Sequence, residues 1–250
     1  MKMKLRFAIP MAAAALLAFT AATPAQTFSE GQRQEIEGIV KDYLLKHPEV
    51  IQDVMSALEK KQQEAEAEKA ATTIKQNNAT LFNSPHQVVL GNPQGDVTVV
   101  EFFDYNCAFC KRALPDMLTL LKTDPNLKFV LKEFPVLGEG SVEAAHVAVA
   151  ARMQDPTGKK YVEFHQKLLG GRGPADKARA LAVAKEVGFD MPRLEKDMAS
   201  GEVTTTINED MKLADALGVN GTPSYVVGSE VVVGAVGLDA LKEKIAAERK

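Results

Sequence analysis

The sequence is poor in cysteine, with only Cys107 and Cys110 among 250 residues. A structural zinc site built on C-x-x-C needs two further ligands, and the four histidines lie at scattered positions without that spacing. A purely structural disulfide would close a loop too short to constrain the unfolded chain much. These exclusions leave a redox role as the favoured interpretation of the pair.

The sequence also lacks an excess of basic residues. The first 25 residues carry three basic and no acidic side chains, so the remainder has 27 basic against 33 acidic residues and a net charge near −6. Proteins that bind nucleic acid rely on clustered positive charge to neutralise phosphates. The composition therefore argues against nucleic acid as a partner.

Long apolar runs are absent except at the N-terminus, between Phe7 and Ala22. Three basic residues precede this run, and small residues up to Ala25 follow it, which predicts a secretory signal peptide over residues 1–25. A membrane anchor is the alternative, but the run is short and no stop-transfer flank follows. Export places the cysteines in an envelope or extracellular compartment, where disulfides can form.

The stretch from Val97 to Lys111 reads V-T-V-V-E-F-F-D-Y-N-C-A-F-C-K. Its first seven residues are mostly β-branched or aromatic, which predicts a strand buried on both faces of a sheet. A polar turn follows, and then C-x-x-C opens an amphipathic helical pattern through Leu114, Leu118 and Leu121. This order of strand, turn and helix is typical of a thioredoxin-type redox site.

The position of the cysteines suits disulfide exchange. A sulfur at a helix N-terminus faces unpaired backbone N–H groups and the positive end of the helix dipole, which stabilise a thiolate. We therefore expect Cys107 to be the attacking and leaving sulfur. Cys110, one turn further along, is placed to attack the mixed disulfide formed at Cys107.

Apolar residues recur at helical spacing before the main domain, from Ile36 to Leu44 and again from Ile51 to Leu58. The stretch 59–71 is highly charged and predicts a solvated helix or stiff linker. The stretch 72–85 has weaker helix propensity and is expected to fray or bend. We interpret 26–82 as a helical pair on a charged tether, with self-association favoured over folding back onto the main domain.

The main domain is expected from residue 83 to residue 250, with an α/β pattern. Strands are predicted at 88–90, 97–103 and 127–134, and a hairpin at 224–233. Between them lies a helical insertion over about 140–200, in which Phe164 and His146 are expected to pack rather than react. Gly221-Thr222-Pro223 before the hairpin is compatible with a tight turn containing a cis peptide bond.

Several motifs together carry a family resemblance. Glu101-Phe102-Phe103 is followed by Cys107-Ala108-Phe109-Cys110, by the helical insertion, and by Gly221-Thr222-Pro223 ahead of a hairpin. In this order they resemble the DsbA family of thioredoxin-fold proteins, and with the N-terminal helices the ScsC-type (suppressor of copper sensitivity) branch. The resemblance implies a thioredoxin fold with a helical insertion, preceded by a helical oligomerisation segment, and a periplasmic location.

The resemblance also assigns roles. Cys107 matches the family's exposed nucleophile, Cys110 its resolving thiol, and Pro223 the cis-proline that faces them. The backbone of Thr222 would pair with an extended substrate. Glu101 matches the buried acid that handles the proton of Cys110, and burial should raise its pKa toward neutrality. The alternative for Glu101 is a buried ion pair with Lys132 on the neighbouring strand.

The residues between the cysteines depart from the strongly oxidising members of the family. Ala108-Phe109 offers no cation to the thiolate, so we expect a less depressed pKa at Cys107 and a less oxidising pair. Phe109 gives an apolar surface beside the disulfide, and an aromatic there with Thr222 before the proline is similar to the disulfide isomerases. The expected activity is therefore a protein disulfide isomerase or reductase, with a dithiol oxidase as the alternative.

The resemblance further implies partners and a second chemistry. Substrates would be envelope proteins with disulfides, a membrane redox partner would keep the pair reduced, and residues 26–82 would form a homotrimer, with a dimer second. No cofactor is expected beyond the redox-active Cys107–Cys110 disulfide. Two thiolates at this spacing also suit Cu(I), so copper binding is an alternative. The methionines, such as Met117, are expected to fill the core.

Overall fold

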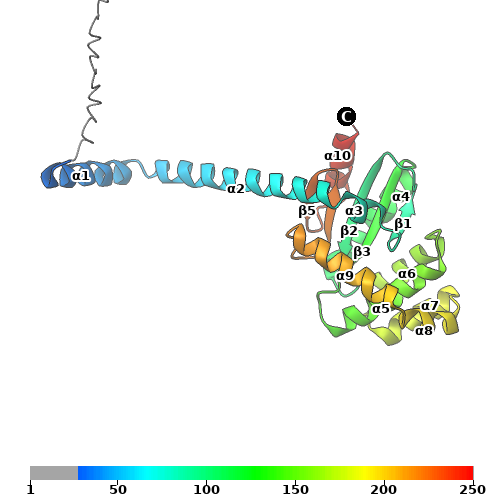
Figure 1. Ribbon diagram of the computed structural model, residues 1–250. Helices are drawn as coiled ribbons and strands as arrows, with labels where there is room; N and C mark the ends of the chain where they lie inside the picture. The colour runs from blue at the N-terminus through cyan, green and yellow to red at the C-terminus, as the bar shows by residue number, and fades with distance from the viewer. Residues whose placement is uncertain (1–27, 250) are drawn as a thin grey trace, which may run out of the picture. The chain divides into compact units, whose positions relative to one another are not determined.

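The computed structural model describes residues 28–249, in two compact units that divide between Leu58 and Glu59 (Figure 1). The predicted signal peptide, residues 1–25, lies outside the described residues. Within the described range, no helix combines the length and the apolar character needed to cross a membrane. The domain boundaries drawn from the sequence stay predictions.

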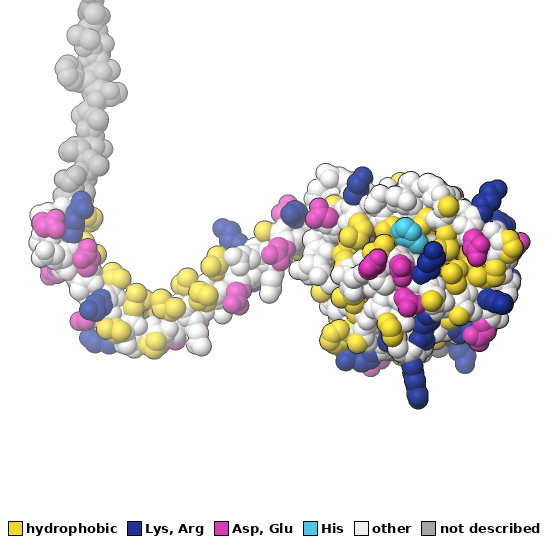
Figure 2. All heavy atoms as spheres, turned by 90° about the horizontal axis from the view of Figure 1, so that it is seen from below, with side chains coloured by type: hydrophobic (Ala, Val, Ile, Leu, Met, Phe, Trp, Pro, Cys, Tyr) yellow, Lys and Arg dark blue, Asp and Glu magenta, His cyan; other side chains and the backbone are white. Residues whose placement is uncertain are grey.

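The first unit contains α1 (Glu30–Lys46) and the beginning of α2 (Glu49–Gln76). α1 begins with a capping box, in which Ser29 and Gln32 satisfy each other's backbone N–H groups. None of the residues in α1 is buried. Figure 2 shows hydrophobic side chains along these helices, and the large exposed ones are Ile36, Ile39, Val40, Tyr43, Leu45, Ile51, Val54, Met55 and Leu58.

The second unit is built on a five-stranded sheet in the order β1-β3-β2-β4-β5. β2 and β3 run parallel, and the other neighbouring strands are antiparallel. The predicted central strand, parallel unit and C-terminal hairpin are thus confirmed. The strands are β1 (Val88–Gly91), β2 (Val97–Phe103), β3 (Leu127–Glu133), β4 (Ser224–Val227) and β5 (Glu230–Val233).

Helices cover both faces of the sheet. Val99 and Phe103 of β2 belong to one core cluster, shared with α4, α10 and the helical insertion. Val100 and Phe102 point to the other face and belong to a second cluster, shared with α9. The insertion helices α5 to α8 gather into one group (Figure 1). The helices are α4 (Ala108–Thr123), α5 (Glu139–Gln154), α6 (Lys159–Leu169), α7 (Lys177–Val187), α8 (Met191–Met198), α9 (Gly201–Ala216) and α10 (Leu238–Glu248).

The stretch 72–85 packs against the second face of the sheet. It contains the end of α2 and the short helix α3 (Asn78–Asn83), and its Ile74 and Leu81 are buried in the second core cluster. The expected fraying is therefore wrong, while the expected bend is present at Asn77, between the two helices. Propensity is a weak guide when a segment buries apolar side chains in tertiary contact.

Two buried lysines of β3 hold α3 in place. Lys128 Nζ donates to the carbonyl oxygen of Phe82 at 2.7 Å. Lys132 Nζ donates to the carbonyl oxygen of Thr80 at 3.2 Å and forms an ion pair with Asp210 of α9 at 3.0 Å. Because the side chains of Lys132 and Asp210 are both fully buried, breaking this pair would leave an uncompensated charge in the core.

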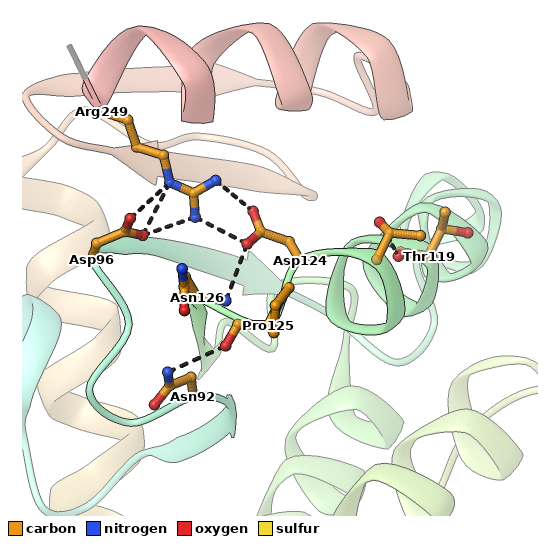
Figure 3. A network of polar contacts seen from close by, with 8 residues as sticks. Asn92, Asp96, Thr119, Asp124, Pro125, Asn126 and Arg249 are labelled. Atoms are coloured by element: carbon orange, nitrogen blue, oxygen red, sulfur yellow. Dashed lines mark hydrogen bonds and ion pairs between the residues drawn. The ribbon is translucent and has the colours of Figure 1, made fainter.

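Arg249 joins three elements at the start of β2 (Figure 3). Its guanidinium donates to both carboxylate oxygens of Asp96, just before β2, and of Asp124, which ends α4. Nearby, Asn92 Nδ2 donates to the carbonyl oxygen of Pro125 at 3.2 Å. These contacts fix the start of β2 and the end of α4. In each element this is the end away from the cysteines.

Candidate active site

The two cysteines lie at the junction of β2 and α4. β2 ends at Phe103, a turn follows, and Cys107 is the N-cap residue of α4, its Sγ accepting from the backbone N–H of Cys110 at 3.4 Å. Cys107 is 5 % exposed and Cys110 fully buried, and both are free thiols. The predicted position of Cys107 at the helix start is confirmed. The exposure expected of the nucleophile is wrong, because the side chain is 5 % exposed and its Sγ lies against the carbonyl oxygen of Thr222.

The surroundings of the two sulfurs separate their acidities. The pKa of Cys107 is lowered to about 5, because the Cys110 thiol hydrogen-bonds to it, and Thr222 and the backbone N–H groups of Cys110 and Phe109 add to this effect against burial. The pKa of Cys110 is raised, first by donating to Cys107 and then by burial. At neutral pH the pair therefore holds one thiolate, at Cys107, and one thiol.

The 221–223 turn faces Cys107 from the other side of the site. The Thr222–Pro223 peptide bond is cis, as the sequence predicts. In its thiol form, Cys107 donates to the carbonyl oxygen of Thr222 at 3.1 Å. Ser224 Oγ donates to the carbonyl oxygen of Gly221 at 2.8 Å and fastens the turn to β4. Thr222 thus presents its backbone beside the reactive sulfur.

Glu101 lies on β2, beneath the cysteines, and is 4 % exposed. Its pKa is raised to about 8, chiefly by burial and then by the charge on Cys107, while a hydrogen bond from Tyr225, its register partner on β4, opposes the rise. A carboxylate with this pKa can accept a proton near neutral pH. The geometry is that expected for the buried acid.

The alternative partner of Glu101 is wrong. Glu101 stands opposite Leu131 in the register of β2 and β3, and Lys132 stands opposite Phe102. Adjacent strand residues point to opposite faces, so Lys132 lies on the far face of the sheet, where it pairs with Asp210. The sequence could not reveal this partner of Lys132, which lies 78 residues away.

The residues between the cysteines form the exposed rim of the site. Ala108 is exposed, and Phe109 is 54 % exposed. The guanidinium of Arg112 lies over the Phe109 ring, 4.7 Å from its centroid. The arginine thus stacks on the aromatic side chain, and hydrogen bonds account for the lowered pKa of Cys107.

The turn before Cys107 contains site residues that the sequence analysis treated only as a connection. Asp104 is 1 % exposed, and its Oδ1 accepts from Ser141 Oγ at 2.7 Å. Its Oδ2 accepts from the backbone N–H of Leu137 at 3.0 Å. Tyr105 reaches α6, where its hydroxyl lies 3.0 Å from that of Tyr161. The sequence signal for these site residues is the aromatic Tyr105 between the polar Asp104 and Asn106.

Among the described residues, no further metal-ligating side chains gather around the two thiols. Within residues 28–249, no three or more histidine, cysteine, aspartate or glutamate side chains gather as a metal site would require. Burial lowers the pKa of His165 to about 3, so it is neutral, and it lies 3.3 Å from the Tyr105 hydroxyl. Phe164 is fully buried, which confirms its packing role. Two-coordinate Cu(I) on Cys107 and Cys110 stays an expectation.

Comparison with known proteins agrees with this geometry. The DSBA-like thioredoxin domain matches residues 98–246, and the copper resistance protein ScsC N-terminal domain matches residues 32–65. A thioredoxin-like oxidoreductase from Silicibacter pomeroyi DSS-3 is 48 % identical, with a TM-score of 0.65, over 69 % of this chain and 98 % of that one. A linker-deletion mutant of Proteus mirabilis ScsC, 24 % identical, has the same fold with a TM-score of 0.68 over 90 % of this chain and 98 % of that one.

Curated relatives extend the comparison. Disulfide bond formation protein D of Bacillus subtilis is 27 % identical over 70 % of this chain and 84 % of its own length. Na(+)/H(+) antiporter NhaA 1 of Salinispora arenicola is 28 % identical over 63 % of this chain, which spans only 24 % of that longer protein. The matched domain thus also occurs as a part of larger chains. By its matched domain, its fold and its dithiol site, the chain belongs to the DsbA-like thioredoxin family, with an N-terminal segment of the ScsC type.

Proposed function

We propose that the protein is a thiol–disulfide oxidoreductase that isomerises or reduces incorrect disulfides in other proteins. The observation that carries this proposal is the contrast between the two sulfurs, with a pKa of about 5 at Cys107 and a raised pKa at the buried Cys110. Such a pair presents a nucleophile and retains a proton on the resolving thiol until it is needed.

The first step is attack by the Cys107 thiolate on a substrate disulfide. A bond forms between Cys107 Sγ and one substrate sulfur, and the other substrate sulfur leaves as a thiolate. For reduction, Cys110 passes its proton to the ionised form of Glu101 and attacks Cys107 Sγ, which gives the Cys107–Cys110 disulfide and frees the second substrate sulfur as a thiolate. For isomerisation, the freed substrate thiolate attacks a different substrate disulfide, and a later substrate thiolate releases Cys107 unchanged.

The assignment as an isomerase rests on the rim of the site. Ala108 and Phe109 leave the thiolate without a neighbouring imidazolium, and the pKa of about 5 at Cys107 lies between about 7 for thioredoxin and about 3.5 for the strong oxidant DsbA. The exposed Phe109 ring suits the apolar segments that a misfolded protein presents. A dithiol oxidase, the alternative, would show fast oxidation of substrates with no shuffling.

The N-terminal unit is proposed to join several copies of the chain. Its exposed side chains from Ile36 to Leu58 form a large apolar surface, of the kind that soluble proteins cover by association. A homotrimer is favoured over a dimer by the resemblance to the ScsC branch. Joined copies would bring several redox sites to one substrate and raise their effective concentration.

The compartment and the electron donor belong to the same proposal. Residues 1–25 have the pattern of a signal peptide, and the related Salmonella enterica protein, 28 % identical, is described as periplasmic. A periplasmic location fits a redox-active pair. Because reduction leaves Cys107 and Cys110 oxidised, a membrane redox partner must return two electrons to them.

Refolding of scrambled ribonuclease tests the function. We expect the full chain to restore ribonuclease activity and a chain beginning at residue 59 to lose most of that ability while still reducing glutathione disulfide. The truncation should not extend to residue 82, because Ile74 and Leu81 belong to the core. Rapid oxidation of reduced ribonuclease without reshuffling would contradict the isomerase assignment.

Copper handling is a second candidate, favoured by the match of residues 32–65 to a copper resistance family. The reduced protein would be titrated with Cu(I) against a chelator of known affinity. Tight binding that is lost in both Cys107→Ser and Cys110→Ser would support it, since both thiolates are needed as ligands. Binding that survives either change would place the copper elsewhere.

A further inference from the structure

The residue just before Cys107 forms a bridge to the helical insertion. Asn106 Nδ2 donates to the carbonyl oxygen of Ala175 at 2.8 Å, and Asn106 Oδ1 accepts from the Ala175 N–H at 2.7 Å. The second Nδ2 hydrogen goes to Ser141 Oγ at 3.0 Å. A side-chain amide is suited to this pairing, because it presents a donor and an acceptor as a peptide group does.

The residue just after Cys110 holds the same loop from the opposite end of the motif. Lys111 Nζ donates to the carbonyl oxygens of Gly171 and Gly173, each at 3.4 Å. The loop 170–175 contains three glycines, and Gly173 has a φ of +79°, so few of its own side chains fix its path apart from the buried Ala175. Its position depends on anchors from outside, and two of these flank the C-x-x-C motif.

The redox motif is therefore held between two loops. On one flank, Cys107 contacts the carbonyl oxygen of Thr222 in the 221–223 turn. On the other flank, Asn106 and Lys111 hold the loop 170–175. We propose that Asn106 is a positioning residue that keeps the loop 170–175 beside Cys107, so that this loop acts as a specificity-determining wall for protein substrates.

This inference rests on the proposed function and separates binding from chemistry. The ionisation of Cys107 depends on hydrogen bonds from Cys110, Thr222 and backbone amides, and the Asn106 side chain is not among them. A loop that must be ordered upon binding makes a large partner bind more weakly. Glutathione disulfide makes few contacts beyond the reacting sulfurs, so its reaction should not depend on the loop.

The insertion offers a matched control for Asn106. Gln154 Nε2 donates to the carbonyl oxygen of Asp190 at 3.0 Å, and Gln154 Oε1 accepts from the Asp190 N–H at 3.0 Å. This is the same amide-to-backbone bridge in the same group of helices, but it joins the end of α5 to the start of α8. Gln154→Ala therefore removes the same pair of amide-to-backbone bonds at a place that does not hold the loop 170–175, while the bond of Asn106 to Ser141 has no counterpart in it.

The experiment compares Asn106→Ala with Gln154→Ala in the full chain. For each, kcat and KM are measured with scrambled ribonuclease and with glutathione disulfide, and the pKa of Cys107 is read from thiolate ultraviolet absorbance. In Asn106→Ala we expect KM for ribonuclease to rise about tenfold, with kcat, glutathione reduction and the Cys107 pKa unchanged. In Gln154→Ala we expect all four to match the wild type.

Other outcomes decide against the inference. Equal KM values for ribonuclease in the two variants would overturn it, as would a parallel loss of glutathione reduction in Asn106→Ala. If Asn106→Ala does not fold, Lys111→Met loosens the same loop from the other side, and an unchanged ribonuclease KM there would overturn it too. A wild-type protein that reduces glutathione disulfide but not ribonuclease would instead contradict the proposed function.

Discussion

The two compact units place their apolar side chains differently. In α1 none of the residues is buried, and large apolar side chains from Ile36 to Leu58 are exposed. In β2 six of the seven residues are buried, and helices cover both faces of the sheet. The second unit therefore completes its core within one chain, whereas the apolar face of the first stays exposed within one chain.

This difference separates two tasks. The charged and polarised groups of the redox site, Cys107, Cys110 and Glu101, all lie in the unit with the closed core, which can hold them in a fixed geometry. The open unit carries none of them. We therefore expect changes in one unit to alter chemistry and changes in the other to alter assembly, and the following experiments test that separation.

The largest effect is expected at the nucleophile. Cys107→Ser removes the thiolate, so disulfide exchange should fall by more than about a thousandfold. The mass of the protein in solution should not change, since Cys107 belongs to the closed unit. The matched variant Cys110→Ser should instead accumulate a mixed disulfide with substrate. Comparable exchange rates in Cys107→Ser and wild type would contradict the assigned role.

The next effect concerns assembly. Ile39→Glu places a charge on an exposed apolar side chain of α1, so we expect the mass in solution to fall to that of a monomer. The pKa of Cys107 and the rate with glutathione disulfide should stay within about twofold of wild type, since the redox unit is complete by itself. Glu35→Gln, in the same helix, is the control. A monomeric wild type would remove the contrast between the units.

A smaller effect is expected from the buried acid. The unfolded chain loses the Glu101 proton near its ordinary pKa of 4.5, whereas the folded protein keeps it up to about 8. Stability is therefore unaffected below pH 4.5, falls as pH rises from 4.5 to 8, and stays lower above. Glu101→Gln abolishes this loss, so it should gain on the order of 3 kcal/mol at pH 8 and almost none at pH 4.

Denaturant unfolding of the reduced protein at several pH values measures this gain. The exposed Glu243→Gln serves as the control and should follow the wild-type curve. If the curves of Glu101→Gln and wild type run parallel between pH 4 and pH 8, the raised pKa of Glu101 is wrong.

The smallest effect is expected at the surface ion network. Arg249→Ala breaks the contacts to Asp96 and Asp124, and we expect a loss of about 1 kcal/mol in the free energy of unfolding, because the arginine side chain is 31 % exposed and solvent screens it. The loss should shrink at high salt. Lys60→Ala, which breaks a single exposed pair in α2, should change almost nothing. A salt-independent loss would contradict this view.

Much of the active site could be predicted from the sequence because its signals are local. The run from Val97 to Phe103, the C-x-x-C spacing and the Thr222-Pro223 turn each reveal their structure within a few neighbouring residues. The apolar stripe from Ile36 to Leu58 could also be predicted from its helical spacing, and its large side chains are exposed in the structure. That it joins several copies of the chain stays a prediction.

The remainder depends on contacts between distant residues. Lys132 pairs with Asp210 rather than Glu101 because the register of β2 and β3 sends the two side chains to opposite faces. Asn106 finds Ala175, 69 residues away, and nothing in its own neighbourhood indicates that partner. Such pairings follow from the packing of the whole domain and not from local propensity.

The hydrogen bonds from Lys128 and Lys132 to α3 affect how the domain unfolds locally. A helix of six residues is unstable alone, yet its backbone carbonyls are held by lysines of a central strand. Its amide hydrogens should therefore exchange with deuterium only in the rare events that also expose β3, and far more slowly than those of α1. In hydrogen exchange, α3 is therefore expected to open together with the sheet and not as a separate helix.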